Sequence, residues 1–282
     1  MHIASDIVVS LYNPAGATPG MLSSGVEVRH GDYNDPASLD AAFAGTDRLL
    51  LVSSPSIAHT QRVAHHMAAI DAAKRAAVKR VYYTSLAFAS DSRAAVMQAH
   101  LDTERYLKGS GIAYTILREG IYSESYPLYF GFWSATEGED EVLVPHSDGG
   151  IAWVCREDLG EGTAKIMVGG GYENETCLLS GSRTVTLGQI AEKVSQLLGR
   201  NIKLAVGSED DYVQRNLGKN GPRGEEEFLR KWATTYKAME RGELEVVDPL
   251  LEESVGRSLK PFEHTLKETL SIHGSVMEQY AK

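Results

Sequence analysis

Residues 6–120 alternate short apolar runs with amphipathic helical patterns, and this alternation restricts the chain to few architectures. The apolar runs of strand length lie near residues 6–12, 26–29, 48–53, 80–84 and 113–118. Between them, apolar residues recur every three to four positions, which is the period of a helix packed through one face. Strands separated by helices are typical of βαβ units. The sequence therefore predicts an α/β fold in which all five runs join one parallel sheet.

Several helix ends are marked by capping residues. Asp35 precedes Pro36, so an N-cap carboxylate is followed by a proline at the first helical position. Thr186 and Gln189 form a capping box, which predicts a helix that begins there and ends at Gly199. We expect further helices over residues 60–77, 94–108 and 158–168, and a charged, solvated helical layer over 208–245.

A dinucleotide-binding sheet of this class begins with a strand, a glycine-rich turn and a helix, and we find no such unit. Residues 6–13 already have the pattern of the second strand, and only five residues precede them. Gly109-Ser-Gly111 and Gly169–Gly171 follow helical patterns, so we interpret them as helix ends. Either the second strand pairs directly with the fourth, or the chain is a shortened form. Since the amides that hold a pyrophosphate are missing, we expect weak or no dinucleotide binding.

Composition argues against several classes of partner. The formal net charge of −10 disfavours nucleic acid, because DNA binders present a basic face. No apolar run is long enough to span a bilayer, so we expect no membrane partner. Cys155 and Cys177 have neither disulfide nor metal-ligand spacing, which predicts reduced thiols in a cytoplasmic protein. His59, His65 and His66 lack ligands at metal-binding spacing, so we expect no metal site and place these histidines at the surface.

Polar side chains follow the strands at their carboxyl ends, where ligands bind in open α/β sheets. Ser53 and Ser54 close one apolar run, and Thr84 and Ser85 close the next. Together they leave room for a flat ligand and offer hydroxyl donors to it. Asp32 ends the run before them, and its carboxylate can accept from an adenine amino group. The alternatives are strand caps for the hydroxyl residues and a self-satisfied turn for the aspartate.

His100 and Glu104 are four positions apart and share one helix face. A neutral histidine at a cleft can donate to a ribose hydroxyl or move a proton. The alternative is an exposed ion pair, worth about 0.3–0.5 kcal/mol.

The pattern changes after residue 120, where aromatic residues are dense and apolar runs become short. Short strands are expected at 142–144 and 151–154. We predict a nucleotide-binding domain, shortened at its N-terminus, from residues 1–121 with 151–180. We predict a smaller α/β substrate-binding region from residues 122–150 with 181–282.

Three stretches resemble the NmrA-like family of atypical short-chain dehydrogenases and reductases: Gly25–Gly45, Gly111–Arg118 and Arg156–Leu159. The resemblance covers about residues 6–270, and the sequence as a whole is similar to that of a fungal member. It implies a Rossmann-like domain that binds NADP(H) and a small C-terminal region that closes over the substrate.

The resemblance also assigns cofactor-binding positions, namely Asn13, Asp32, Tyr33, Ser53, Ser54 and Pro55. Thr84 and Ser85 complete the predicted cofactor site. Asn13 replaces the arginine that often meets the 2′-phosphate of NADP, which leaves NAD and NADP both open.

The catalytic assignments are less direct. None of the 13 tyrosines is followed four positions later by lysine, so the usual tyrosine–lysine pair of short-chain reductases is missing. His100 occupies the position where many relatives carry the active-site lysine. Tyr122 and Tyr126 match the loop that faces the substrate, and His100 and Tyr122 are therefore the candidate catalytic residues.

These observations predict an NAD(P)H-dependent oxidoreductase, or a truncated form of one, that acts on an aromatic or quinone-like small molecule. Fungal secondary metabolism is the setting that the resemblance implies. The aromatics at 122–133 and Trp153 would line the pocket, with the proton supplied by water, His100 or the substrate. Two alternatives stay open: a non-catalytic redox-sensing regulator with a protein partner, and a cofactor-free isomerase or cyclase.

Overall fold

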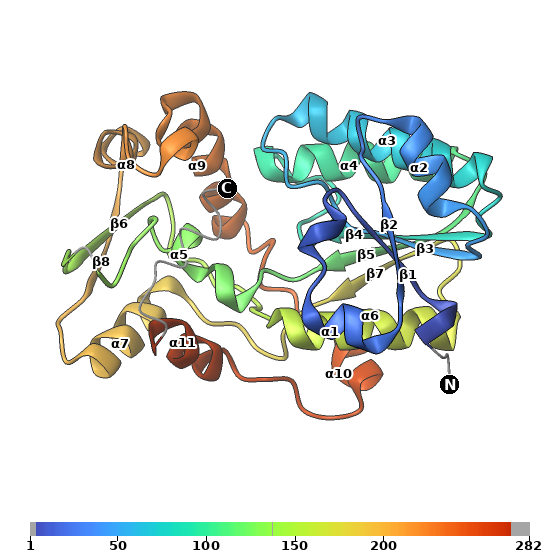
Figure 1. The fold of residues 1–282 in the computed structure, drawn as a ribbon. Coiled ribbons are helices and arrows are strands. Elements are labelled where there is room, and N and C mark those ends of the chain that lie inside the picture. The colour runs from blue at the N-terminus through green and yellow to red at the C-terminus, as the bar shows by residue number, and fades with distance from the viewer. Residues whose placement is uncertain (1–3, 137, 272–282) are drawn as a thin grey trace. The chain divides into compact units, whose positions relative to one another are not determined.

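The computed structural model describes residues 4–136 and 138–271, which form two compact units (Figure 1). The first unit contains residues 4–85, 99–116 and 172–176. The second unit contains residues 86–98, 117–136, 138–171 and 177–271.

Each of the five predicted apolar runs forms a strand, and the α/β class is confirmed. The strands are β1 (Val8–Leu11), β2 (Glu27–His30), β3 (Arg48–Leu51), β4 (Arg80–Leu86) and β5 (Ala113–Glu119), joined by the unpredicted β7 (Glu175–Leu179). The helices among them are η1 (Ala4–Asp6), η2 (Pro14–Gly16), α1 (Pro19–Ser24), α2 (Pro36–Phe43), α3 (His59–Arg75) and α4 (Ala95–Gly109). Prediction missed β7 because its first two residues are polar and exposed.

The five predicted strands do not form one sheet, so that prediction is wrong. β1 pairs with β2 in parallel, with Val9 opposite Val28. β3, β4, β5 and β7 form a separate sheet in that order, and Leu50 of β3 lies opposite Tyr82 of the parallel β4. In the strand order of a doubly wound sheet one further strand separates β1 from β3, and no described residue forms it. Because ladder hydrogen bonds join only strands about 4.8 Å apart, β1 and β3 do not pair.

The strand β3 is less buried than its apolar sequence predicts. We expected both of its faces to be covered, as in the centre of a parallel sheet. Leu49 and Leu50 are only half-buried, and Val52, directly after the strand, is 58% exposed. Leu51 is 2% exposed, so one face of the strand is packed. The partial exposure follows from the pairing of β3 with a single described neighbour.

The core of the first unit lies between this sheet and helices α2, α3 and α4 (Figure 1). Leu39 and Phe43 of α2 are buried on one face, as their spacing predicts. The Asp35 side chain caps α2 by accepting from the Ala37 amide, at 3.1 Å. The buried face of α3 consists of His66, Ala69, Ile70, Ala72 and Ala73.

The second unit is built mainly from helices. They are α5 (Tyr126–Tyr129), α6 (Arg156–Gly169), α7 (Leu187–Leu198), α8 (Glu209–Asn216), α9 (Glu226–Glu240), α10 (Leu250–Val255) and α11 (Phe262–Ser271), with η3 (Ser123–Ser125) and η4 (Gly221–Gly224). The strands β6 (Glu141–Pro145) and β8 (Lys203–Gly207) pair in parallel. The predicted capping box of Thr186 and Gln189 is present, and α7 ends at Gly199 in the left-handed conformation, as predicted.

Two predictions for the second unit are wrong. Residues 151–154 form only single bridges, from Ile151 to Val185 and from Val154 to Tyr122, because their partners are single residues rather than strands. The charged segment 208–245 is not a solvated layer. Its helices α8 and α9 bury apolar residues at helical spacing, and both Tyr212 and Tyr236 are fully buried.

Trp153 and most of the aromatic segment form the core of the second unit. Trp153 is 4% exposed, packs edge-on against Tyr129 with ring centroids 5.7 Å apart, and donates from Nε1 to the Val185 carbonyl oxygen at 3.0 Å. Phe262 of α11 also packs against it, with ring centroids 5.2 Å apart. These contacts make Trp153 part of the core, and its pocket-lining role stays a prediction.

Both cysteines are buried, and neither is in a disulfide, as predicted. Cys155 caps α6, since its Sγ accepts from the Asp158 amide at 3.4 Å. Burial raises the pKa of this thiol to about 11. No helix within residues 4–136 and 138–271 is long and apolar enough to cross a bilayer.

The half-open strand β3 gives a stability prediction. Leu51→Ala removes a packed side chain and should lower the free energy of unfolding by about 2–5 kcal/mol. Val52→Ala, one residue later, removes a mostly exposed side chain and should change it by less than about 0.5 kcal/mol. Chemical denaturation of both variants measures the difference. Equal losses in the two variants would contradict the exposure described for this edge.

Candidate active site

The turn that follows β3 is held by side chains from neighbouring elements. The Ser53 amide donates to Thr84 Oγ1 at 2.9 Å. The Ser54 amide donates to His66 Nε2 at 2.8 Å, and the Ser54 hydroxyl lies 2.9 Å from His65 Nδ1. The structure therefore brings together the predicted site residues of two strand ends. Since the bonds to Ser53 and Ser54 use backbone amides, they fix the course of the turn itself.

A further hydrogen bond joins this turn to the residues that follow β2. The Tyr33 hydroxyl donates to the Val52 carbonyl oxygen at 2.8 Å. The Tyr33 ring stacks on His65 with centroids 5.5 Å apart and an interplanar angle of 18°. His65 Nε2 lies 3.1 Å from Asn34 Oδ1. The residues that follow β2 and β3 are thus connected, although the two strands belong to different sheets.

A buried polar cluster lies behind the turn. His66 Nδ1 is 2.8 Å from Thr103 Oγ1, and Thr103 donates onward to the Ala99 carbonyl oxygen at 2.8 Å. The Tyr83 hydroxyl is 2.9 Å from His100 Nδ1 and 3.4 Å from His66 Nδ1. Burial raises the pKa of the Tyr83 hydroxyl well above its usual range. The cluster thus connects two histidines through one tyrosine that stays protonated.

The interpretation of His100 and Glu104 as an exposed ion pair is wrong, because both side chains are buried. His100 is 5% exposed and Glu104 is 3% exposed. Glu104 accepts from the Ser85 hydroxyl at 2.6 Å, whereas His100 contacts Tyr83. The shared helix face was predicted correctly, but it packs on β4 and does not face water.

The placement of His66 at the surface is also wrong. Its side chain is fully buried, because it lies three and four positions before Ala69 and Ile70 on the packed face of α3. His65 is half-buried between Tyr33 and Ser54. His59 is exposed as predicted, and its Nε2 lies 2.9 Å from Asp102.

The remaining predicted cofactor residues lie in exposed or partly exposed turns. Asp32 Oδ1 accepts from the amide of Asn34 at 2.8 Å, so this carboxylate stabilises its own turn. Asn13 Oδ1 accepts from the Ala15 amide at 3.1 Å and caps η2. Pro55 is exposed. Cofactor contacts of these residues stay predictions.

Tyr122 belongs to the second unit. Its hydroxyl donates to Glu119 Oε2 at 2.6 Å. Glu119 is buried, and burial raises the pKa of its carboxyl group. Tyr126 is buried against Phe262, with ring centroids 6.3 Å apart, so it belongs to the core. A catalytic role for Tyr122 stays a prediction.

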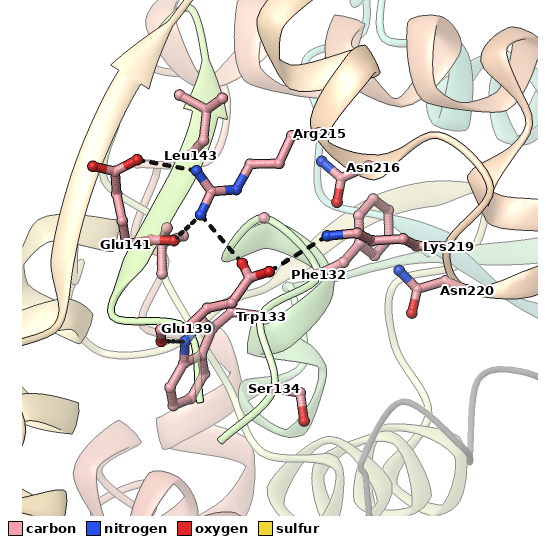
Figure 2. A pocket seen from close by; sticks show the side chains of 12 residues that line it. Phe132, Trp133, Ser134, Glu139, Glu141, Leu143, Arg215, Asn216, Lys219 and Asn220 are labelled. Atoms are coloured by element: carbon pink, nitrogen blue, oxygen red, sulfur yellow. Dashed lines mark hydrogen bonds and ion pairs between the residues drawn. The ribbon is translucent and has the colours of Figure 1, made fainter. Parts of the chain in front are cut away.

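The second unit contains a cavity of 440 Å³ that sequence reasoning did not predict (Figure 2). Arg215 lines it, with Nη1 3.0 Å from Glu141 Oε1 and Nη2 3.2 Å from Glu139 Oε2. The Lys219 Nζ lies 3.4 Å from Glu139 Oε1. Phe132 and Trp133 are the aromatic residues of the segment 122–133 that line it. Its two carboxylates and two cationic groups are paired with each other. They lie far apart in the sequence, so no local motif predicts this cavity.

Comparison with known proteins identifies the family. A profile of the NmrA-like family matches residues 17–264. The chain belongs to the NmrA-like family. The resemblance inferred from the residues is therefore confirmed.

Two curated relatives align with most of this NmrA-like chain. The NmrA-like family domain-containing oxidoreductase flvB of Aspergillus flavus is 34% identical over 273 residues, which cover 94% of this chain and 87% of the relative. Quinone oxidoreductase 2 of Escherichia coli is 36% identical over 210 residues, which cover 74% and 71% respectively.

Solved structures of NmrA-like relatives match the fold closely. The structure of the Escherichia coli NADPH-dependent quinone oxidoreductase complexed with NADPH has a TM-score of 0.83 and 30% identity, over 95% of this chain and 92% of that one. The Citrobacter sp. triphenylmethane reductase complexed with NADP(H) has a TM-score of 0.81, with the same identity and coverage.

The strand-end residues fit part of a dinucleotide. Val52 and Pro55 offer exposed apolar surface for a ring beside the anchored turn. Arg62 lies one helical turn before His66, and its buried Nε has no hydrogen-bond partner among the described residues. Such an orphaned cationic donor fits an anionic oxygen. The described residues form no glycine-rich turn between a strand and a helix, and weak dinucleotide binding stays a prediction.

Arg62 and His66 are the site residues that sequence reasoning missed. Their four-residue spacing puts both on one face of α3, next to Tyr83. The signal was available in the apolar positions Ala69 and Ile70, which mark the same face. A search for metal ligands could not find it, and no three His, Cys, Asp or Glu side chains converge on a metal site in the described ranges.

The protonation of His66 gives a pH prediction. Burial, together with the charge of Arg62 and with His65, lowers its pKa to about 3, whereas an unfolded chain has a histidine pKa of about 6.5. Between these values the unfolded chain binds a proton that the folded chain does not. Above pH 6.5 this residue should therefore have no effect on how the free energy of unfolding changes with pH. Below about pH 6.5 it should lower the free energy of unfolding by up to about 1.4 kcal/mol for each pH unit.

His66→Gln removes this titrating group and should reduce the pH dependence of unfolding between pH 6 and 4 by about that amount. Urea denaturation at a series of pH values measures the slope. His59→Gln, an exposed position of the same helix, should change the slope much less. If His66→Gln leaves the slope as in the unmodified chain, the buried neutral state of His66 is wrong.

Proposed function

We propose that the chain is an NADPH-dependent oxidoreductase that reduces a quinone-like or aromatic small molecule. The names of its relatives support this function, because they include a quinone oxidoreductase complexed with NADPH and a triphenylmethane reductase complexed with NADP(H). Both solved relatives match over 95% of the chain. The cytosol is the compartment we propose, since both cysteines lie outside disulfides.

The anchored turn after β3 is the observation that carries the proposal. Three side chains from three different elements hold Val52, Ser53 and Ser54 by their backbone groups. A turn fixed in this way is preorganised, so a ligand that binds beside it does not have to order it. It lies at the carboxyl end of β3, where α/β sheets bind ligands.

We assign binding roles to the groups around this turn. The chemistry that the dinucleotide supplies when bound is a hydride from its nicotinamide ring. Val52 and Pro55 provide apolar surface for the ring, and the Ser53 hydroxyl, 3.3 Å from His66 Nε2, provides a polar contact beside it. Arg62 holds an anionic oxygen of the cofactor. The turn at Asp32 is assigned to the adenosine side.

A proton is also needed when a quinone accepts a hydride. We assign it to water or to His100, whose Nδ1 lies 2.9 Å from the Tyr83 hydroxyl. The Tyr122 hydroxyl already donates to Glu119 Oε2 at 2.6 Å, so we do not assign the proton transfer to Tyr122.

The regulator and isomerase alternatives are less well supported. A regulator needs a protein partner, and no relative considered above is named for one. A cofactor-free isomerase does not explain why the buried Nε of Arg62 has no hydrogen-bond partner among the described residues. The reductase function accounts for the family, the anchored turn and this cation together.

The direct test is oxidation of NADPH in the presence of benzoquinones, naphthoquinones and triphenylmethane dyes, followed by absorbance at the NADPH band. We expect turnover with at least one of these acceptors. Absence of both turnover and NADPH binding in calorimetry would overturn the proposed function.

The assigned role of Arg62 gives a sharper prediction. Arg62→Ala removes a charge-assisted hydrogen bond and should raise the dissociation constant of NADPH about tenfold or more. Arg75→Ala is the matched control, because Arg75 lies on the same helix and is exposed in a pair with Asp40. Fluorescence titration with NADPH measures both variants. Equal affinity in the two would remove Arg62 from the cofactor site.

A further inference from the structure

The hydrogen bonds of His66 have only one possible direction. A backbone amide can only donate, so the Ser54 amide makes Nε2 an acceptor at 2.8 Å. A carbonyl oxygen can only accept, so the Ala99 oxygen takes the proton of Thr103 Oγ1. Thr103 must then accept from His66 Nδ1, at 2.8 Å. The ring is therefore the neutral tautomer with its proton on Nδ1, and both ends of the chain of bonds are fixed by backbone groups.

The surroundings of His66 oppose a second proton. Its side chain is fully buried. From its own helix, the charges of Arg62 and His65 lower the pKa of His66. From β4 it meets the neutral Tyr83, with ring centroids 5.3 Å apart. From α4 the ring meets the neutral hydroxyl of Thr103. Protonation of Nε2 would in addition break the bond to Ser54.

We propose that His66 is the positioning residue of the reductase site. It holds the turn of Ser53 and Ser54 in place through Nε2, and it does so only as the neutral Nδ1–H tautomer. The inference rests on the proposed function, since that function places the nicotinamide beside this turn. Thr84 is the second anchor, on the amide of Ser53, so loss of His66 frees the half of the turn that leads to α3.

Two near-isosteric variants separate positioning from simple packing. Glutamine can place Oε1 where Nε2 lies and so keep an acceptor for the Ser54 amide. Asparagine can place Nδ2 where Nδ1 lies and so keep the donor to Thr103, while the Ser54 amide loses its partner. Asparagine is one methylene shorter than glutamine and leaves the larger gap. A packing role therefore predicts defects in proportion to the loss of thermal stability, whereas a positioning role predicts defects in His66→Asn that its loss of stability does not explain.

The first measurement is the exchange of the Ser54 amide with solvent, in the protein without any ligand. We expect exchange at least tenfold faster in His66→Asn than in the unmodified chain, with His66→Gln close to the latter. His59→Gln serves as control. Equal exchange rates in the two His66 variants would overturn the positioning role.

The second measurement is affinity and turnover. At a temperature where both variants are folded, we expect the dissociation constant and KM of NADPH to rise at least tenfold in His66→Asn and less than threefold in His66→Gln. A loss of affinity that follows the loss of thermal stability in both variants would overturn the proposal. If the unmodified chain neither binds NADPH nor turns over, the proposed function fails and the reductase part of this inference with it, while amide exchange still decides whether His66 holds the turn.

The tautomer has its own test in the unmodified chain. In the chain labelled with ¹⁵N-histidine, the His66 ring should show one protonated and one unprotonated nitrogen, unchanged between pH 5 and 8. His66→Gln assigns the signal by its disappearance. A ring that titrates in this range would overturn the neutral, single-tautomer role.

Discussion

Among the described strands, β3 has a hydrogen-bonded neighbour on one side only, and much of the first unit follows from this. A strand in the middle of a sheet is held on both edges, so its carboxyl end needs no further support. Here β4 provides one ladder and no described strand provides the other. Leu49 and Leu50 remain half-buried, and Val52 is exposed at the strand's end. The end of β3 must be fixed by other means.

Side chains provide that support. Tyr33, Thr84 and His66 each bond to a backbone group of the turn, and they come from the end of β2, from β4 and from α3. Buried backbone amides need partners, and a histidine acceptor in the core satisfies one that a strand could not. The polar cluster of histidine, tyrosine and threonine is therefore part of the architecture as well as of the site. Structure and proposed chemistry depend on the same contacts.

The sequence predicted local structure better than connections. Periodicity placed five strands correctly, and Asp35 and Thr186 marked helix starts as expected. Sheet membership could not be predicted, because it depends on which strand lies next in space. His66 was misplaced although Ala69 and Ile70 already indicated its buried face. The spacing of possible metal ligands along the chain does not reveal its partners, because these are the Ser54 amide and Thr103.

Long-range ion pairs and aromatic packing were beyond sequence reasoning for a related reason. Arg215 meets Glu139 and Glu141 across more than seventy positions, and nothing local predicts the pairing. The dense aromatic residues between 122 and 133 predict a pocket wall, but in the structure most of them pack on each other and on Trp153. Density of aromatic residues alone does not distinguish a core from a binding surface, because both bury rings.

The proposed reduction of quinones gives the burial of the two thiols a further consequence. Quinones are electrophiles that arylate accessible thiolates, so a reductase exposed to them risks modification by its own substrate. Cys155 uses its sulfur as a helix cap, is 1% exposed and has a pKa raised to about 11, so its thiol is protonated at pH 7. Cys177 is 6% exposed. Both thiols of the chain are thus sheltered from arylation in the folded state.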